Sequence, residues 1–539
     1  VTAVSTAATT GNSTLTVDAD KATFTGGNGK DTVTLSATTV DKAVSLGGGD
    51  DSLTLAAGTT AISTTVDGGN GTDTLAMDAA DAAALSTADV SDELAGFEKL
   101  SLGQAATAVS IDLANLDGIN YVISAGGAAG SAGNRETFIL SAPGFTEIGN
   151  DTTVTFDGYT YTYIASSYSP YGSAFFFAGN YNTNAISPSY ALIGTANNSM
   201  IFEATSDGNK TDVTSADFVV NAGTTDTGIL SFTVSGVTDG TAASAGGELT
   251  LTKMANAGTL ELTGAATSTT VTMTDATGTA DSFNIITKVS TADLDFGTVD
   301  VQDVETVNIT ATDTNTKAAI NLATLELVGD AKTVVVTGNG DITLTSAITA
   351  LKTVDASALT GDFTFSSAVN SATVTGGAGD DLITGTGNSQ ILTGGLGDDT
   401  LVVQGNLARL TGGVGKDVFD VGAATSTVNS YATITDLAAG DAIKLSAAAL
   451  EFASSAVALA DTASFQDYAN AAIAATDDGE VSWFQFAGNT YVVENVAIQN
   501  SNAPEVTFTN GQDIVVRITG LVDLSTSGFN TTQNALLVV

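Results

Sequence analysis

The sequence predicts an all-β fold of stacked turns, a parallel β-roll or β-solenoid, with an inserted domain and a C-terminal cap. Short strands of alternating apolar and polar residues recur between turns, as in ELTLT (248–252) and TTVTMT (269–274). One glycine-rich motif returns at regular intervals, which is typical of repeat architectures. Intrinsic disorder is the alternative for so acidic a chain, but disordered segments lack the β-branched residues that fill these strands.

A length of 539 residues also favours several domains or a repetitive architecture over one ordinary core. We divide the chain in order into an N-terminal β-roll (1–80), solenoid strands (81–133), an inserted aromatic-rich domain (134–209), further solenoid strands (210–374), a second β-roll (375–421) and a C-terminal cap (422–539).

The N-terminal β-roll rests on three related motifs, GGNGKD (26–31), LGGGDD (46–51) and GGNGTD (68–73). Their sixth positions are Asp31, Asp51 and Asp73, which follow one another after 20 and then 22 residues. The unequal intervals predict bulged turns. Both solenoid segments contain less regular strands, which fit a β-solenoid or stacked β-sandwiches: EKLSLG (98–103), GTLELTG (258–264), ETVNIT (305–310), KTVVVTG (332–338) and KTVDAS (352–357).

The inserted domain is marked by a sharp change in composition. Seven of the 11 tyrosines lie between Tyr159 and Tyr190, and three of the four prolines are in 134–209. We expect a small β-sandwich, in which Tyr159, Tyr161 and Tyr163 share one strand face. An aromatic core explains such residues, and a sugar-stacking or subunit-contact surface is the alternative.

The second β-roll contains the most regular repeat, TGGAGDDLITGTGNSQILTGGLGDDTLVVQGNLARLTGGVGKDVFDV (375–421). Asp381, Asp399 and Asp417 recur every 18 residues, which is two nonapeptides and hence one turn of a flattened helix. The three carboxylates should therefore line one edge. Carboxylates at such short distances repel one another unless a cation lies between them. Calcium accepts mixed carboxylate and carbonyl oxygens in irregular geometry, so it is the expected ion.

These nonapeptides resemble the calcium-binding β-roll of the RTX family. The resemblance implies that several calcium ions are bound by Asp381, Asp399 and Asp417, together with carbonyls from the loops that start at Gly376, Gly394 and Gly412. Asp31, Asp51 and Asp73 are the corresponding ligands of the N-terminal roll. The intervening nonapeptides depart from the family pattern, because they have Gln390 and Ala408 in place of aspartate. We therefore expect calcium along one edge of the second roll only.

The segment ATITDLAAGDAIKLS (432–446) resembles the end of many RTX rolls, where Asp436 and Asp441 are candidate capping ligands or ordinary turn acids. A helix is expected after Thr462 or Ser464, because Phe465, Tyr468 and Ile473 follow a helical period. A hairpin turning at Gly488-Asn489 follows it. The last strands resemble the C-terminal region of type I secretion substrates, which agrees with the absence of a signal-peptide pattern.

The segments VETVNITATDTNT (304–316), TVDASALTG (353–361), WFQFAGNTYVV (483–493) and VRITGLVDLSTSGF (516–529) resemble the lattice-forming half of RTX-type bacterial surface-layer (S-layer) proteins. The resemblance implies a secreted structural subunit on the outer surface of a Gram-negative cell, in a calcium-dependent, hexameric two-dimensional lattice. In that family an N-terminal region binds lipopolysaccharide. The present chain starts without Met and shows no such region, so we expect it to be a fragment.

The composition of the chain excludes or disfavours several classes of protein function. The net charge is −44, which disfavours nucleic acid and anionic membranes as partners. Histidine and cysteine are absent, which excludes a HExxH zinc site, a Ser-His-Asp triad and disulfides within this chain. No apolar run is long enough for a transmembrane helix. We expect no enzyme, although a carboxylate-based glycosidase or a lyase survives in principle. The alternative to an S-layer subunit is an RTX adhesin or sugar-binding surface protein.

Overall fold

The computed structural model describes residues 1–128, 247–275, 277–315, 321–446, 449–496 and 506–539, and the backbone of nine strands between residues 137 and 238. The chain forms two compact units. One consists of Val1–Ala129 and Gly247–Val539, and the other of Gly130–Gly246. The predicted insert at 134–209 lies within the second unit.

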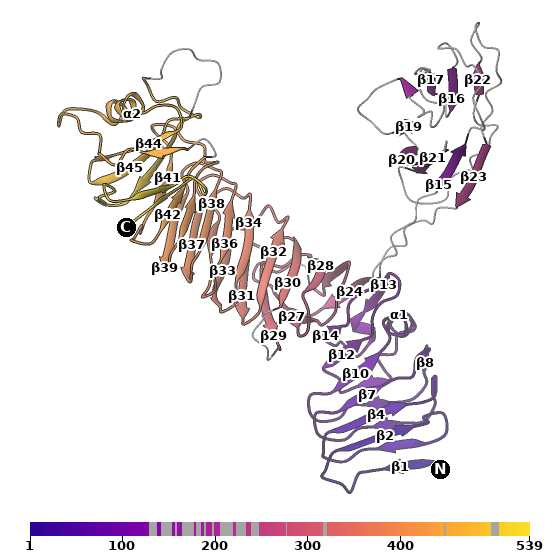
Figure 1. Ribbon diagram of the computed structural model, residues 1–539. Helices are drawn as coiled ribbons and strands as arrows, with labels where there is room; N and C mark the ends of the chain where they lie inside the picture. Colours follow the sequence, from indigo (N-terminus) through magenta and orange to yellow (C-terminus); the bar gives the residue numbers. More distant parts are fainter. Residues whose placement is uncertain are drawn as a thin grey trace. The chain divides into compact units, whose positions relative to one another are not determined.

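The first unit is a parallel β-solenoid of about 14 turns, which confirms the predicted fold class (Figure 1). Each turn adds one strand to a continuous sheet that we call sheet 1. Its parallel strands are β2 (Ser13–Val17), β4 (Asp31–Leu35), β7 (Ser52–Thr54), β10 (Thr74–Met77), β12 (Lys99–Leu102), β14 (Tyr121–Ser124), β25 (Thr259–Leu262), β27 (Ser282–Val289), β29 (Thr306–Asp313), β31 (Thr333–Gly338), β33 (Thr353–Leu359), β35 (Thr373–Thr375), β37 (Ile391–Leu396), β39 (Arg409–Val414) and β41 (Ala432–Ile434).

A second sheet alternates with sheet 1 along the chain, and we call it sheet 2. Its parallel strands are β13 (Val109–Asp112), β24 (Glu248–Met254), β26 (Ser268–Met273), β28 (Leu294–Val301), β30 (Leu322–Gly329), β32 (Asp341–Ser346), β34 (Phe363–Ser367), β36 (Leu382–Gly385), β38 (Thr400–Val403), β40 (Val418–Asp420) and β42 (Ala442–Lys444). The loops that lead into sheet 1 form one edge of the solenoid, here called the sheet 1 entry edge. The loops that lead into sheet 2 form the opposite edge, the sheet 2 entry edge.

The N-terminal turns have three sides, which explains intervals longer than 18 residues. Sheet 3 forms one side, with strands β1 (Ala3–Ser5), β3 (Thr23–Thr25), β6 (Val44–Ser45), β9 (Val66–Asp67) and β11 (Leu94–Ala95). The third side consists of β5 (Thr39–Val40) and β8 (Ala61–Ile62), followed by helix α1 (Ala79–Ala88), which contacts β8 and β13. Sequence analysis did not predict α1. Its alanine content favours a helix, and Leu85 is fully buried in the core.

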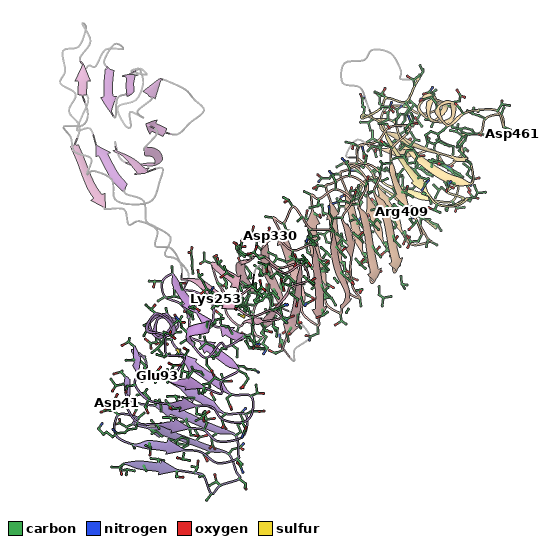
Figure 2. All side chains as sticks on the ribbon, turned by 180° about the vertical axis from the view of Figure 1, so that it is seen from behind. Asp41, Glu93, Lys253, Asp330, Arg409 and Asp461 are labelled. Atoms are coloured by element: carbon green, nitrogen blue, oxygen red, sulfur yellow. The ribbon has the colours of Figure 1, made fainter. Side chains whose placement is uncertain are left out.

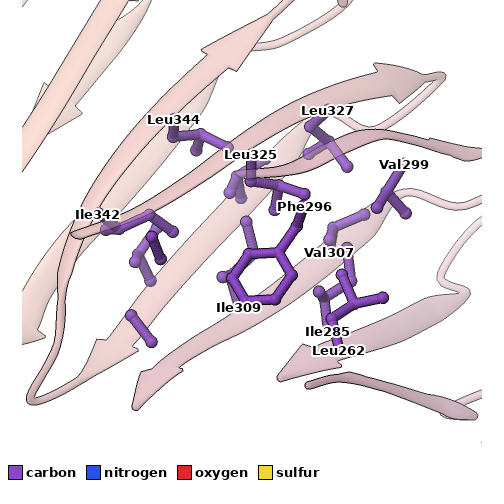
Figure 3. Close-up of a cluster of buried hydrophobic side chains, with 14 of the residues drawn as sticks. Leu262, Ile285, Phe296, Val299, Val307, Ile309, Leu325, Leu327, Ile342 and Leu344 are labelled. Atoms are coloured by element: carbon purple, nitrogen blue, oxygen red, sulfur yellow. The ribbon is translucent and has the colours of Figure 1, made fainter. Parts of the chain in front are cut away.

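Alternation of side chains builds one hydrophobic core between the sheets. In β27 and β29 every second residue is buried. Figure 3 shows Ile285 and Ile309 of sheet 1 facing Phe296 and Leu325 of sheet 2. In the second roll, the eighth position of the nonapeptides is buried and the seventh points outward, as with Ile383 and Leu382. Removing apolar surface from water at every turn stabilises the stack.

The solenoid continues across the insertion, because β13 pairs with β24 and β14 pairs with β25 in parallel register. The inserted unit contains two antiparallel sheets, built from β15 (Thr137–Ser141), β16 (Thr153–Phe156), β17 (Tyr159–Tyr163), β18 (Phe177–Ala178), β19 (Ala185–Ser187), β20 (Tyr190–Ala196), β21 (Ser199–Ala204), β22 (Val219–Asn221) and β23 (Thr233–Thr238). The tyrosines on β17 were predicted to share a face, but their side chains lie outside the described part of the chain.

The C-terminal cap extends both sheets. Sheet 1 gains β46 (Ile514–Ile518), β45 (Asn489–Glu494), β44 (Glu480–Phe486) and β43 (Glu451–Phe452), and sheet 2 gains β48 (Ala535–Leu537) and β47 (Gly528–Asn530). Helix α2 (Phe465–Ala474) packs on β44 and β45. It confirms the predicted helix, and its N-cap is Ser464. Among the described helices, none has the length and apolarity to span a membrane.

Candidate metal centre

The three aspartates of the second roll form one buried row. Asp381, Asp399 and Asp417 each stand directly before a strand of sheet 2, on the sheet 2 entry edge, and at most 2% of each residue is exposed. The backbone N–H of Asp381 donates to Asp399 Oδ1 (2.9 Å), and that of Asp399 donates to Asp417 Oδ1 (3.0 Å). The 18-residue interval therefore places one carboxylate above the next, as the sequence predicted.

The two acids after the roll take different places. Asp441 extends the buried row, because its Oδ1 accepts the N–H of Asp417 at 3.0 Å. Asp436 is exposed and accepts the N–H groups of Gly412 and Gly413 at 3.0 and 2.9 Å. Its carboxylate thus lies against the last glycine-rich loop, on the side where the roll ends. Both acids are positioned to close the roll.

The buried row leaves one oxygen without a partner. Asp399 Oδ2 is buried and accepts no hydrogen bond. A Cβ atom placed on Gly394 would lie 2.1 Å from Asp399 Oδ2 and 2.6 Å from the carbonyl oxygen of Gly412. Carboxylate and carbonyl oxygens thus meet in a small space that is open only because residue 394 is glycine. An unpartnered buried carboxylate oxygen costs free energy, and a cation there removes that cost.

A similar space lies one turn earlier, although there Asp381 Oδ2 accepts the N–H of Gly377 at 2.6 Å. A Cβ atom on Gly376 would lie 2.1 Å from Asp381 Oδ2 and 2.4 Å from the carbonyl oxygen of Gly394. Within the described ranges, no three acidic side chains come close enough to bind a metal by themselves. Carbonyl oxygens must therefore complete any ligand set, and an all-oxygen set of this kind suits calcium.

Burial makes the row costly to ionise. Burial, together with the neighbouring carboxylates of Asp381 and Asp417, raises the pKa of Asp399 to about 7. Burial, with a smaller contribution from Asp362 and Asp380, raises the pKa of Asp381 to about 6. Without a cation, these groups hold protons far more readily than exposed aspartates do.

A second, outer row runs beside the buried one, and sequence analysis missed it. The Oδ1 atoms of Asp341, Asp362 and Asp380 each accept the N–H of the acid one turn later, at 2.8 Å. Asp398 accepts the N–H of Lys416 in the same way, at 2.8 Å. The sequence signal for the outer row was the pairs of adjacent acids at 380–381 and 398–399. Only the second acid of each pair was predicted as a ligand. The outer carboxylates of 362, 380 and 398 are exposed.

The N-terminal roll contains an equivalent buried row. The N–H of Asp31 donates to Asp51 Oδ1 (2.6 Å), and that of Asp51 donates to Asp73 Oδ1 (2.8 Å). Asp51 Oδ2 and Asp73 Oδ2 are buried without a hydrogen bond, and burial raises the pKa of Asp73 to about 6. The exposed Glu98 continues the row by accepting the N–H of Asp73 at 2.7 Å. Sequence analysis missed Glu98 because no glycine motif precedes it.

The two buried rows lie on opposite edges of the solenoid. Asp31, Asp51 and Asp73 precede or begin strands of sheet 1, whereas the aspartates of the second roll precede strands of sheet 2. Along the sheet 1 entry edge, later turns replace the acids by Lys332 and Lys352. The sequence motif is nearly the same in both rolls, so it did not reveal this difference.

Amide groups replace the acids on the sheet 1 entry edge of the second roll. Gln390 is fully buried, and its Nε2 donates to the carbonyls of Ser367 (3.0 Å) and Val369 (2.8 Å). Three asparagines form a row on the same edge. The backbone N–H of Asn388 donates to Asn370 Oδ1 at 2.8 Å, and the backbone N–H of Asn406 donates to Asn388 Oδ1 at 3.0 Å. Amides thus stand on this edge where the other edge has carboxylates, and Gln390 Oε1 is buried without a hydrogen bond.

No protein-family model matches the chain, and no curated protein matches it. What the geometry defines is a class, the parallel β-solenoid, with rows of buried aspartates on its edges.

Proposed function

We propose that this protein is a secreted, structural S-layer subunit that forms a calcium-dependent two-dimensional lattice on the outer cell surface. The observation that carries the proposal is the pair of buried aspartate rows in a repetitive solenoid, in which Asp51, Asp73 and Asp399 each have an unpartnered Oδ2 and that of Asp399 lies beside a backbone carbonyl. The residues that fit calcium are the buried aspartates of both rolls and the carbonyls of the glycine-rich loops. A calcium ion there would neutralise carboxylates that otherwise repel one another.

Calcium binding by such sites would couple folding to the extracellular environment. A site with a dissociation constant of ~0.1 mM gains about 1.4 kcal/mol in ~1 mM calcium. Several such sites together approach the ~5–15 kcal/mol that stabilise a typical domain. The chain would then remain poorly folded in calcium-poor cytoplasm and fold after export.

Electron microscopy tests the lattice. The purified chain, dialysed from chelator into millimolar calcium, should form two-dimensional sheets or rings, and chelator should dissolve them. Magnesium at the same concentration is the control and should not replace calcium, because it tolerates irregular oxygen geometry poorly. A calcium-loaded chain that stays monomeric at high concentration contradicts the proposal.

An adhesin or sugar-binding surface protein is the second candidate, and the separate compact unit of Gly130–Gly246 favours it. A glycan array probed with the full chain and with a variant lacking 130–246 distinguishes the two. Sugar-specific binding that disappears with the deletion supports the adhesin. A chain that assembles into sheets and binds no glycan supports the lattice.

A further inference from the structure

The N-terminal buried row ends against a turn that has no glycine motif. Asp73 is fully buried, and its Oδ2 has no hydrogen-bond partner. The chain continues from Asp73 through helix α1 and β11, and it returns to the sheet 1 entry edge at Glu98. A buried carboxylate oxygen without a partner costs free energy, so this end of the row requires a further partner.

Glu98 takes the place of a motif aspartate in that turn. Its Oε2 accepts the backbone N–H of Asp73 at 2.7 Å, as Asp73 Oδ1 accepts the N–H of Asp51 at 2.8 Å. Gly96 precedes Glu98 by only two residues, whereas the first glycine of a complete motif precedes its aspartate by five. The extra methylene of glutamate lets its carboxylate reach Asp73 from this shorter loop.

A backbone carbonyl of the same loop meets the buried aspartate beside Gly68. A Cβ atom placed on Gly68 would lie 2.1 Å from the carbonyl oxygen of Gly96 and 2.9 Å from Asp73 Cβ. In the second roll, a carbonyl oxygen and an aspartate also meet beside Gly394. Gly96 therefore presents its carbonyl as the first glycine of a complete motif does, although its turn has no such motif.

Among the described residues, no lysine or arginine pairs with the carboxylate of Glu98. Its one described hydrogen bond comes from the N–H of Asp73, so Oε1 accepts none. Lys99 is next in the sequence, but its Nζ lies over the ring of Tyr121, 4.7 Å from the ring centre. The carboxylates of Asp73 and Glu98 thus come together without a positive charge, and such a pair attracts a cation.

The pair of Asp281 and Glu305 has the same hydrogen bond but also has a lysine beside it. The N–H of Asp281 donates to Glu305 Oε2 at 3.1 Å, and Asp281 Oδ2 is buried without a hydrogen bond. There Lys332 Nζ lies 3.4 Å from Glu305 Oε1. The later pair is therefore a matched control, in which the chain itself supplies the positive charge.

We propose that Asp73, Glu98 and the carbonyl oxygen of Gly96 bind a calcium ion in addition to the ions of the two rolls. Calcium accepts mixed carboxylate and carbonyl oxygens, with water at the remaining positions. Because Glu98 is exposed, the ion reaches the site from solvent. The ion joins the last motif turn to the turn that contains α1. The inference rests on the proposed calcium-dependent function and adds a ligand set that no motif marks.

Calorimetric calcium titration tests the site. Glu98→Gln keeps an acceptor for the N–H of Asp73 but removes the charge, so it should lower the number of bound ions by one or weaken one ion at least tenfold. Glu305→Gln should change neither number nor affinity, because Lys332 already pairs with that glutamate. Glu93→Gln removes a carboxylate from the same turn as Glu98, between α1 and β11 (Figure 2), and should likewise have no effect.

Hydrogen exchange gives an independent readout. The N–H groups of Glu98 and Lys99 donate to the carbonyl of Asp73 at 3.2 and 3.0 Å. In the parent chain they should gain protection when calcium replaces chelator, and Glu98→Gln should abolish that gain while residues 375–421 keep theirs.

The outcomes separate this site from the proposed function. If Glu98→Gln binds as many ions as the parent with the same affinities, or if Glu93→Gln loses as much as Glu98→Gln, the site is wrong and the proposed function stands. If the parent chain binds no calcium at all, both are wrong.

Discussion

At the scale of single residues, Asp399 is the strongest candidate for a metal ligand. It is fully buried, lies between the carboxylates of Asp381 and Asp417, and has a carboxylate oxygen without a partner. Gln390 is equally buried in the same roll, but it lies on the opposite edge and uses its Nε2 for two carbonyls. The two residues therefore form a matched pair for testing which edge binds calcium.

We predict that Asp399→Ala weakens calcium binding to the second roll at least tenfold, about 1.4 kcal/mol, and more than the same change at Asp381 or Asp417. The reason is that the middle carboxylate serves neighbouring ions on both sides. Gln390→Ala should lower stability with little effect on calcium affinity. Calorimetric calcium titration of each variant measures the difference. Equal losses of affinity at 399 and 390 would show that calcium is not confined to one edge.

Calcium-free protein should be more stable in mild acid than at pH 8. The folded-state pKa values of about 7 for Asp399 and about 6 for Asp381 and Asp73 exceed the ordinary unfolded value. The folded state thus binds more protons, so its stability is fully present near pH 4 and is lost as the pH rises to about 7. Melting temperatures in chelator between pH 4.5 and 8 test this prediction.

Calcium should reverse that trend, since it binds the ionised carboxylates and competes with protons. Melting temperatures in saturating calcium should therefore rise or stay level over the same pH range. Asp399→Asn should reduce the slope seen in chelator, because it removes the group with the highest of these pKa values. A chelated protein that gains stability as the pH rises is incompatible with buried, protonated carboxylates.

At the scale of elements, the position of the buried rows depends on the number of sides in each turn. The 18-residue interval predicted correctly that Asp381 and Asp399 lie on one edge. The motifs at Asp31 and Asp51 resemble those of the second roll in sequence, but they lead into sheet 1. The reason is that the N-terminal turns have a third side made of β5, β8 and α1. No local sequence pattern predicts the third side, because it forms through packing between successive turns. Glu98 and the outer row were missed for a related reason, since their hydrogen bonds run between turns.

Helix α2 shows how local signals can decide a boundary. Sequence analysis left Thr462 and Ser464 as alternatives, and the structure selects Ser464, whose Oγ accepts the N–H of Asp467 while the Asp467 carboxylate accepts the N–H of Ser464. We predict that Ser464→Ala lowers the free energy of unfolding of the cap by about 1 kcal/mol. Thr462→Ala should have no measurable effect. Denaturant unfolding followed by Trp483 fluorescence checks both, and equal effects would argue against the capping box.

At the scale of the whole molecule, sequence predicted the solenoid, the insertion and the cap helix, because strand alternation and composition are local properties. It did not reveal that the buried aspartate rows of the two rolls lie on opposite edges, which depends on the register of paired strands. The result is a solenoid with candidate metal rows on opposite edges of its two ends. In the C-terminal half, an acidic edge faces away from an edge of lysine and amides.

The proposed function requires calcium to complete the buried aspartate rows. Amide hydrogen exchange of residues 375–421, measured at pH 8 in excess chelator and again after millimolar calcium is restored, tests this requirement. We predict that the N–H groups of Asp381 and Asp399 lose protection in chelator and regain it with calcium, while magnesium does not restore it. Protection that is the same with and without calcium would contradict the claim.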